Sequence, residues 1–259
     1  MSPLSNIYYI SDLHWNVWCR NYATHIFRYI VWNRFKNCEN TNLPLENCVL
    51  VIAGDISPLI QPKESFVSFY HNDILTEFKR TFRFSDIVWH AGNHEFDTSN
   101  IVHPDILNEY RQIAYDTQTH FLHRSIYTNN KLKVEVGGCV LWTPSRYKEE
   151  YKYDLDFIRY YSYRPKKIGW RRILSTHYLP IPELIHSKYK NIKFDNRKFA
   201  NNLLEPQYKI AWNHIDVSIC GHTHTSMSVE KQINDFHKIH YGVYPIGYPI
   251  ESNSLFFKN

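Results

Sequence analysis

The chain has 259 residues, of which 43% are hydrophobic, 21% charged and 16% aromatic, and its formal net charge is +5. This length can bury a substantial core and the aromatic content excludes a disordered chain, so we expect one globular domain over residues 1–259. No apolar run approaches the roughly 18 residues of a membrane helix, and the first residues lack the basic start of a signal peptide. The five cysteines are scattered and form no CxxC pair, which favours free thiols. We therefore expect a cytoplasmic protein that does not associate with a membrane.

Short apolar runs that end in polar clusters recur along the chain. They lie at 7–10, 49–53, 86–91, 171–175 and 216–220, and their β-branched and aromatic residues predict buried strands. Apolar residues at helical spacing predict helices over 22–35, 65–82, 105–115 and 195–212, the last interrupted by Pro206. Strands that alternate with helices indicate βαβ units and a largely parallel sheet.

Two further segments show the alternation of strands that follow one another directly. Residues 125–142 predict consecutive strands with turns at Asn129-Asn130 and Gly137-Gly138, and the residues after Ser226 alternate in the same way. We expect these strands to belong to a second sheet, mixed or antiparallel.

Polar side chains stand directly after the five predicted strands of the first group. They are Asp12, His14, Asp55, Asn93, His94, His177, His222 and His224. Ligands of α/β proteins gather at the carboxyl ends of strands, so we expect these side chains to converge. We expect Gly92 and Gly221 to let the backbone turn sharply off the sheet there.

The chemistry of these side chains indicates a metal site. Each short motif alone is common in capped turns, but Gly-Asp, Gly-Asn-His-Glu and Gly-His-x-His together at strand ends are not expected by chance. Carboxylate, imidazole and amide oxygen, without thiolate, suit divalent Mn, Fe, Zn, Ni or Mg. There are more ligands than one ion needs, which favours two ions that share a bridging carboxylate.

This order of motifs resembles the calcineurin-like metallophosphoesterase family, from Asp12 to about Glu251. Residues 141–143 and 244–249 add a resemblance to a bacterial and phage-type subgroup. The resemblance implies an α/β fold, a four-layer αββα sandwich of two mixed β-sheets flanked by helices. It also implies a centre of two divalent ions, with Mn²⁺ expected first. By position, Asp12, His14 and His224 would hold one ion, Asn93, His177 and His222 the other, and Asp55 would bridge.

The resemblance further implies hydrolysis of phosphoester bonds by attack of metal-bound hydroxide. Its catalytic residues would be Asp55 and His94, and His94 would donate a hydrogen bond or proton to the phosphate or the departing oxygen. Many relatives carry an acid three residues after the Gly-Asp motif that orients the catalytic histidine, where this chain has Pro58. Asp97 is the candidate that would replace it. Tyr178 stands where relatives often have a second histidine, and we assign it no ligand role.

A basic, aromatic segment at about 144–171 is expected as an insertion in this domain. Residues 146–172 contain nine Lys or Arg against four acids, and six tyrosines are interleaved with them. Because the segment lies between two predicted strands, we expect both its ends near the metal centre. It could form a groove for single-stranded nucleic acid, with Arg146 and Tyr147 as substrate contacts. The alternative is an amphipathic helix whose tyrosines cover the core while its cations reach solvent.

The sequence favours a phosphodiesterase whose partner is a nucleotide or a single-stranded nucleic acid. A phosphomonoesterase, acting on nucleotides or on proteins, is the first alternative. A non-catalytic metal-binding scaffold of the same fold is the second, although every ligand position is filled. A module that only binds nucleic acid is the third, and the modest net charge speaks against it. The oligomeric state stays open.

Overall fold

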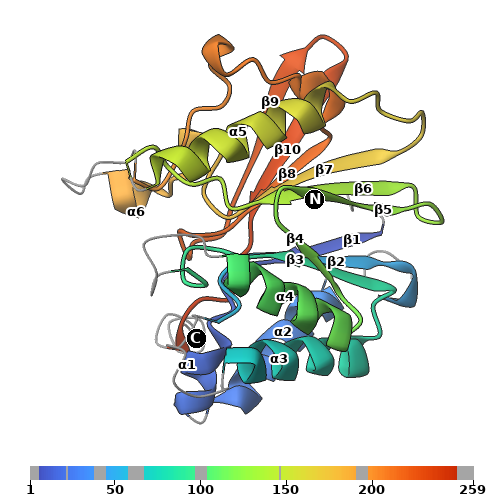
Figure 1. Ribbon diagram of the computed structural model, residues 1–259, viewed down its shortest axis with the longest axis vertical. Helices are drawn as coiled ribbons and strands as arrows, with labels where there is room; N and C mark the ends of the chain where they lie inside the picture. Colours follow the sequence, from blue (N-terminus) through green and yellow to red (C-terminus); the bar gives the residue numbers. More distant parts are fainter. Residues whose placement is uncertain are drawn as a thin grey trace.

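The computed structural model describes residues 6–21, 23–37, 45–57, 67–96, 104–145, 147–190 and 198–249. These residues form two β-sheets that pack face to face, with helices on both outer faces (Figure 1). The predicted four-layer sandwich is thereby confirmed. Within the described part of the chain, no helix is both long and apolar enough to cross a bilayer.

The first sheet contains four parallel strands in chain order. They are β1 (Ile7–Ile10), β2 (Val49–Ala53), β3 (Asp86–His90) and β4 (His120–Leu122). In β2, Val49 and Val51 pack between the sheets, whereas Leu50 and Ile52 face the helices. Both faces of this strand are covered, which is why its sequence is apolar throughout.

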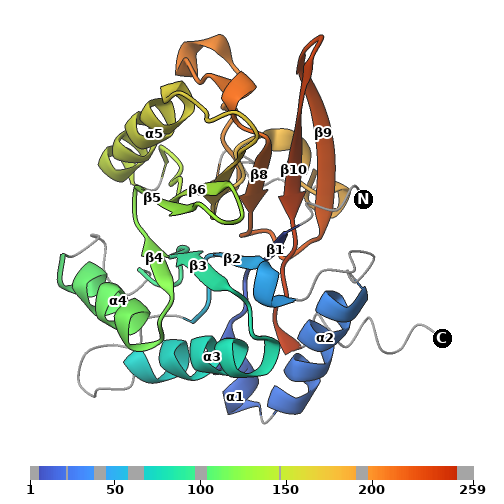
Figure 2. The same ribbon diagram turned by 90° about the vertical axis from the view of Figure 1, so that its right-hand side faces the viewer.

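The second sheet has six strands in the order β5-β6-β7-β8-β10-β9. The inner four, β6 (Val134–Cys139), β7 (Arg171–Thr176), β8 (Val217–Cys220) and β10 (His237–Val243), are parallel. The edge strands β5 (Ser125–Asn129) and β9 (Met227–Asn234) are antiparallel to their neighbours. Figure 2 shows β9 and β10 as a long hairpin at one edge. This sheet is mixed, as predicted, whereas the first is parallel throughout.

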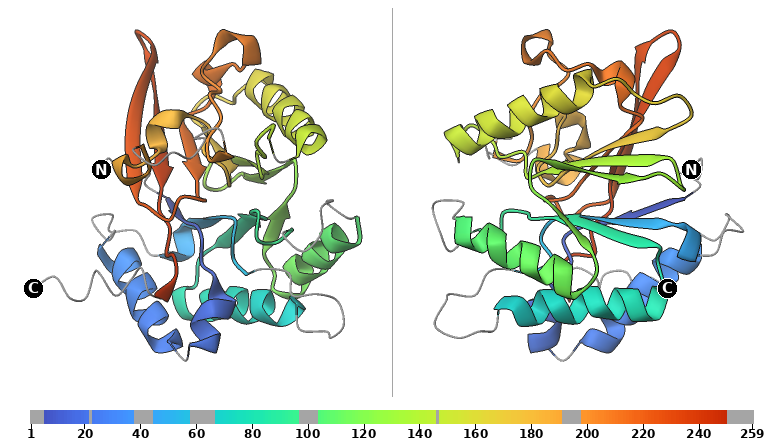
Figure 3. Two further views of the ribbon diagram at one scale, coloured as in Figure 1. Left: turned by 90° about the vertical axis from the view of Figure 1, so that its left-hand side faces the viewer. Right: turned by 45° about the vertical axis from the view of Figure 1, so that its right-hand side comes forward.

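The helices divide between the two outer faces, as Figure 3 shows. The helices α1 (Trp15–Arg20), α2 (Thr24–Asn37), α3 (Val67–Phe82) and α4 (Pro104–Asp116) lie against the first sheet. The helix α5 (Lys148–Tyr163) lies against the second, and the short α6 (Ser187–Lys190) follows β7. In α3 the side chains of Ile74, Phe78 and Phe82, spaced four residues apart, are buried, so one stripe of this helix faces the sheet.

Two local predictions are wrong. In the described part of the predicted helix 195–212, from residue 198 on, the chain forms no α-helix. It contains the 3₁₀ turn Pro206–Tyr208 and the start of another, Trp212–His214, and Ala200 forms a bridge with Leu179. Pro206 cannot donate a helical hydrogen bond, so it begins a new turn instead of continuing a helix. The pair Gly137-Gly138 lies inside β6, not in a turn. Glycine is required there, because a Cβ added at Gly137 would overlap the ring of Tyr161 and one added at Gly138 the side chain of Leu122.

The basic, aromatic segment is the crossover between two parallel strands. In the β6–β7 pair, Val134 lies opposite Arg171 and Cys139 opposite Thr176. The segment therefore leaves β6 at the carboxyl edge and enters β7 at the opposite edge, and the expectation that both its ends lie near the metal centre is wrong. Tyr161 of α5 is fully buried and its hydroxyl donates to the Ile173 carbonyl oxygen at 2.9 Å. This placement supports the alternative of an amphipathic helix that covers the sheet.

Candidate metal centre

The carboxyl ends of β1, β2, β3, β7 and β8 meet at one rim of the sandwich, and the eight predicted polar residues follow these ends. The two sheets are joined there by a bridge between Ser11, just after β1, and Pro245, just after β10. Residues that are more than 200 positions apart in the chain are therefore neighbours at this rim.

One half of the cluster contains Asp12, His14, Asp55 and His224. Each offers one ligand atom, and these four atoms all lie within 4.8 Å of one another. The Nε2 atoms of His14 and His224 are 2.9 Å apart, and His224 Nε2 is 3.5 Å from Asp12 Oδ1. Two imidazole nitrogens and two carboxylates at this spacing form a set of donors suited to a divalent ion.

The other half of the cluster is centred on the amide oxygen of Asn93. This oxygen lies 3.0 Å from His177 Nε2 and 2.9 Å from His222 Nδ1. Asp55 joins the two halves, because its Oδ2 atom is 3.2 Å from His177 Nε2 while its carboxylate also belongs to the first half. The structure thus brings together all seven residues expected as metal ligands, and the acidic residue expected as a bridge lies between the two groups.

Further hydrogen bonds fix the orientation of these side chains. The carbonyl oxygen of Ala53 lies 3.0 Å from His177 Nδ1, which leaves Nε2 of the same ring facing Asp55 and Asn93. The hydroxyl of Ser11 donates to Asp12 Oδ2 at 2.5 Å, and the backbone N–H of His222 donates to Asp12 Oδ1 at 2.9 Å. Such partners hold ligands in place before an ion binds.

Five of the expected ligands have a left-handed backbone. The φ angles are 52° at Asp12, 45° at His14, 54° at Asp55, 74° at His222 and 48° at His224. Non-glycine residues pay on the order of 1 kcal/mol or more for this conformation, and such strain clusters at functional sites. The loops at this rim are therefore bent to direct side chains at one point, at a cost in stability.

Gly92 and Gly221 are required by close packing, and neither has a left-handed backbone. Among the glycines of the sequence motifs, Gly54 has a positive φ, of 82°, whereas Gly92 and Gly221 do not. A Cβ atom at Gly92 would overlap Asp55 Oδ1, and one at Gly221 would lie 2.7 Å from Asp12 Oδ2. Gly92 and Gly221 are thus needed because carboxylates of the cluster approach their backbone closely.

Protonation within the cluster reflects burial and close opposite charges. Burial raises the pKa of Asp12, although His224 acts in the opposite direction. Burial also opposes ionisation of Asp55, but His177, His94 and His14 together outweigh it and hold the pKa of Asp55 well below its ordinary value. Burial alone would lower the pKa of His177, whereas the charge of Asp55 raises it to about 9. Burial lowers the pKa of His14 to about 3. The buried carboxylates require cationic partners, and divalent ions would displace the protons that now supply them.

His94, expected as the catalytic residue, lies at the solvent side of this cluster. Its backbone N–H donates to Asp55 Oδ1 at 2.9 Å, and its Nε2 atom is 3.9 Å from Asp55 Oδ2. The side chain is 33% exposed, whereas that of Asp55 is 2% exposed. His94 is therefore the member of the Asn93-His94 pair that a substrate in solution can reach. Pro58 and Asp97, which bear on its orientation, lie outside the described residues.

Glu95 is a component of the site that the sequence analysis did not single out. Its carboxylate is fully buried and accepts hydrogen bonds from the backbone N–H groups of Asp55, Ile56, Ser57 and Gly92, at 3.1, 2.7, 3.2 and 2.7 Å. It therefore ties the loop after β2 to the loop after β3. The sequence did contain a signal for this role, since Glu95 is the last residue of the Gly-Asn-His-Glu motif. A carboxylate buried at such a position must accept several hydrogen bonds.

Aromatic side chains enclose the cluster. The ring of Tyr248 stacks on His14 with centroids 4.2 Å apart, and the ring of Tyr178 lies 4.1 Å from that of His222. Tyr248 comes from the residues after β10, which pass from the second sheet toward α1 (Figure 2). The sequence analysis gave the run 244–249 no role. In the structure its residue Tyr248 packs against the ring of His14.

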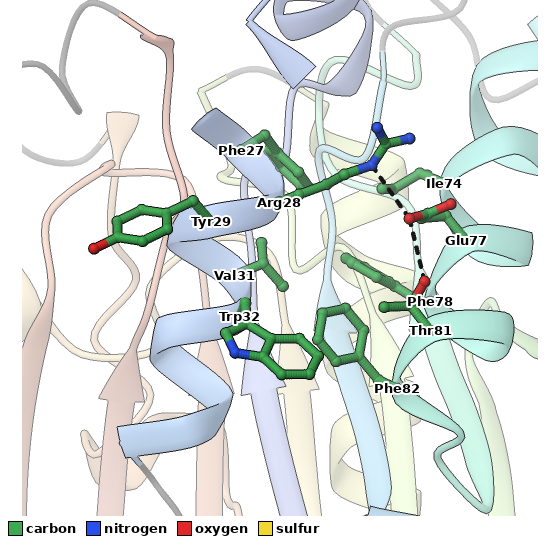
Figure 4. A pocket seen from close by; sticks show the side chains of 10 residues that line it. All are labelled: Phe27, Arg28, Tyr29, Val31, Trp32, Ile74, Glu77, Phe78, Thr81 and Phe82. Carbon is green, nitrogen blue, oxygen red and sulfur yellow. Dashed lines mark hydrogen bonds and ion pairs between the residues drawn. The ribbon is translucent and has the colours of Figure 1, made fainter. Parts of the chain in front are cut away.

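Two pockets differ in their chemistry. One, of about 250 Å³, lies between α2 and α3 and has mainly apolar walls, with an ion pair of 3.2 Å between Arg28 and Glu77 at its side (Figure 4). The other, of about 210 Å³, contains the side chains of Asp55, His94, His222 and His224. Of these two, only the second combines a cavity with the carboxylate and imidazole side chains of the cluster.

The structure does not place either of the two residues expected to contact substrate, Arg146 and Tyr147, in the pocket beside the cluster. Arg146 lies outside the described residues. Tyr147 immediately precedes α5, and its ring packs on that of Trp142 with centroids 4.2 Å apart. It is not among the described side chains that line the pocket beside the cluster. Contact of Arg146 and Tyr147 with substrate stays a prediction.

Comparison with known proteins agrees with this geometry. Residues 5–226 match the sequence model of the family described as calcineurin-like phosphoesterase. No curated protein matches the chain. The matched region covers most of the chain and contains every motif of the cluster, from Asp12 to His224. The chain belongs to the calcineurin-like phosphoesterase family.

Proposed function

We propose that the protein is a phosphoester hydrolase that holds two divalent ions between its sheets. Asp12, His14 and His224 would hold one ion and Asn93, His177 and His222 the other. The observation that carries this proposal is the position of Asp55, whose carboxylate lies 3.2 Å from His177 Nε2 and in the same group as the first three ligands. A carboxylate so placed would be within reach of both ions and would serve as the residue shared between them.

The bound ions would supply Lewis acidity, which withdraws charge from phosphoryl oxygens and makes a water molecule more acidic. The residues of the chain supply the rest. Asp55 is held by the N–H of His94, so the bridge and the catalytic side chain keep a fixed relation. His94 faces the pocket and donates a hydrogen bond or proton to the phosphate or the departing oxygen. Tyr248 and Tyr178 restrict water behind the ligand rings.

Manganese is the ion we propose first, with iron, zinc, nickel and magnesium as alternatives, because the ligand set mixes nitrogen and oxygen without sulfur. We further propose that the substrate is a phosphodiester, of a nucleotide or of nucleic acid, ahead of a phosphomonoester. The support from the segment 144–171 is weaker than its composition suggested, since α5 packs on the second sheet. Aromatic residues beside the cluster supply the stronger support.

The test combines metal analysis with turnover. The purified protein is dialysed against manganese, the bound metal is counted, and hydrolysis of bis(p-nitrophenyl) phosphate is compared with that of p-nitrophenyl phosphate. We expect about two ions per chain. We also expect hydrolysis of the diester to require manganese and to be faster than hydrolysis of the monoester. Bound metal without turnover of either compound would indicate a scaffold, and faster turnover of the monoester would indicate a phosphomonoesterase. A protein that retains no metal would overturn the proposal.

A further inference from the structure

We propose that Tyr189 and Phe199 form a subsite that binds a planar aromatic group of the substrate, a nucleobase, beside the candidate metal centre. This inference rests on the proposed function, because it places the phosphate of the same substrate at the metal ligands. The pocket of about 210 Å³ has two chemically different sides. One carries Asp55, His94 and the ligand histidines, and the other carries Ile185, Tyr189 and Phe199.

The apolar side is adjacent to the metal ligands. The ring of Phe199 lies 5.7 Å from that of His222, centroid to centroid, with 40° between the planes. The rings of Tyr189 and Phe199 are 6.3 Å apart and inclined by only 24°. In a nucleoside phosphate one sugar separates the phosphate from the base, so a phosphate at the ligands brings the base to these rings.

The two rings are held in place and remain accessible. The Tyr189 hydroxyl donates to the carbonyl oxygen of Thr223, between the ligands His222 and His224, at 3.0 Å. Both rings are partly buried, and Ile185 beneath them is 2% exposed. A partly buried aromatic surface that is already held in place loses little entropy when a base stacks on it, and such stacking tolerates different bases.

The charge near the subsite also suits an anionic, aromatic ligand. The Lys188 ammonium lies 4.7 Å from the centre of the Tyr189 ring. The pocket has no acidic side chain among its described lining residues other than Asp55, which the ions would neutralise. A phosphorylated serine or threonine of a protein lacks a planar group that would use this wall. The exposed tyrosines of α5, such as Tyr163, do not line the pocket.

The test compares two ligands that differ only in the base. AMP and ribose 5-phosphate share the phosphate and the sugar, and each is used as a competitive inhibitor of initial rates with bis(p-nitrophenyl) phosphate and manganese. We expect AMP to have an inhibition constant about tenfold lower than ribose 5-phosphate, which corresponds to one stacked base. Equal inhibition constants would overturn the subsite.

Variants separate the subsite from general damage. Phe199→Leu should raise the inhibition constant of AMP by about tenfold and leave that of ribose 5-phosphate within about twofold, which also shows that the variant is folded. The control Tyr163→Leu, at a 61% exposed aromatic residue of α5, should change neither. A Phe199→Leu protein that loses affinity for both ligands equally would contradict the proposal.

Failure of the proposed function has a different signature. In that case the manganese-loaded protein does not hydrolyse the diester at all. The same two ligands are then titrated calorimetrically into that protein, and the ratio of their dissociation constants decides the subsite independently of turnover. A tenfold preference for AMP that depends on Phe199 supports the subsite, and a ratio near one rejects it.

Discussion

The carboxylate of Glu95 lies directly behind Asp55, and its Oε2 atom accepts a hydrogen bond from the Asp55 backbone N–H at 3.1 Å. The same carboxylate accepts the N–H of Gly92, at 2.7 Å, so one side chain sets the spacing between the bridge residue and the loop that carries Asn93 and His94. Glu95 is fully buried, so it is not accessible to a molecule in solution. Its effect on the metal centre is through the backbone of the two loops.

Replacement of Glu95 by glutamine should therefore destabilise the protein strongly. The amide has one acceptor oxygen instead of two and directs an NH₂ group toward backbone N–H donors. We expect a loss of about 3 kcal/mol or more in the free energy of unfolding, measured by urea titration. The control is Glu109→Gln on α4, an exposed residue, which should cost less than about 0.5 kcal/mol. Equal stability of the two variants would show that the Glu95 hydrogen bonds contribute little.

Asp55 and His94 should separate metal binding from turnover. Asp55→Asn removes the charge that lies within reach of both ligand groups, so we expect loss of bound manganese by elemental analysis. His94→Ala removes a side chain that faces the pocket but keeps the backbone N–H that binds Asp55. It should retain metal while kcat falls about 10²- to 10⁴-fold. Wild-type turnover in His94→Ala would show that His94 has no catalytic role.

Gly92→Ala should disable the centre because of a steric overlap. Its methyl group would collide with the Asp55 carboxylate and lie 2.7 Å from His177 Cε1. We expect loss of bound metal and of turnover. Gly169→Ala is the matched control, because no atom lies within 4 Å of its Cβ position, although its φ of 76° is unfavourable for alanine. That variant should lose about 1–2 kcal/mol of stability and keep its metal. Full metal occupancy in Gly92→Ala would contradict the overlap.

His90 should make the protein less stable in weak acid. The ring is 1% exposed and contacts the Ala91 carbonyl oxygen and the Ser175 hydroxyl, each at 2.9 Å, and burial lowers its pKa to about 4. Between pH 6.5 and 4, His90 binds a proton in the unfolded chain, where its pKa is near 6.5, but not in the folded chain. The stabilisation is therefore complete above pH 6.5 and is lost as the pH falls toward 4, at up to about 1.4 kcal/mol per pH unit.

The measurement is the free energy of unfolding between pH 7.5 and 4.5. His90→Gln should flatten this pH dependence, since the titrating group is gone. His25→Gln, at an exposed histidine of α2, should leave the slope as in the wild type. An unchanged slope in His90→Gln would mean that other groups cause the acid sensitivity.

The cations that follow α5 should not affect catalysis. Arg164 Nη2 lies 3.8 Å from Glu135 Oε2, and Lys167 Nζ lies 4.2 Å from the centre of the Trp170 ring. These groups precede β7, at the edge opposite the metal centre. We expect Arg164→Ala combined with Lys167→Ala to leave kcat/KM for the diaryl phosphate within about twofold, because these cations lie at the opposite edge of the sheet and salt screens exposed charges. A tenfold fall that depends on salt would place substrate along this segment.

The sequence was most informative where one local rule decides the outcome. Continuous apolar runs such as Val49–Ala53 predict buried parallel strands, because covering both faces of a strand leaves no polar position. The residues that follow those runs were correctly expected to meet, since the carboxyl ends of parallel strands share an edge. Local rules failed where distant side chains decide. The pair Gly137-Gly138 lies within a strand that pairs on both sides, and these positions are glycine because Tyr161 and Leu122 fill the space beside them.

The sequence by itself determined the kind of chemistry, since the carboxylates, imidazoles and amide behind the predicted strands already define a set of ligands for divalent ions. Only the tertiary structure decided how these groups are arranged. It placed Asp55 between the two groups of expected ligands, tied two loops together through Glu95, and set Phe199 beside His222 and Tyr189 against Thr223. It also carried the far end of the segment 144–171 to the opposite edge. The physical reason is that spacing along the chain fixes only neighbours in sequence, whereas the packing of two sheets brings distant residues into contact.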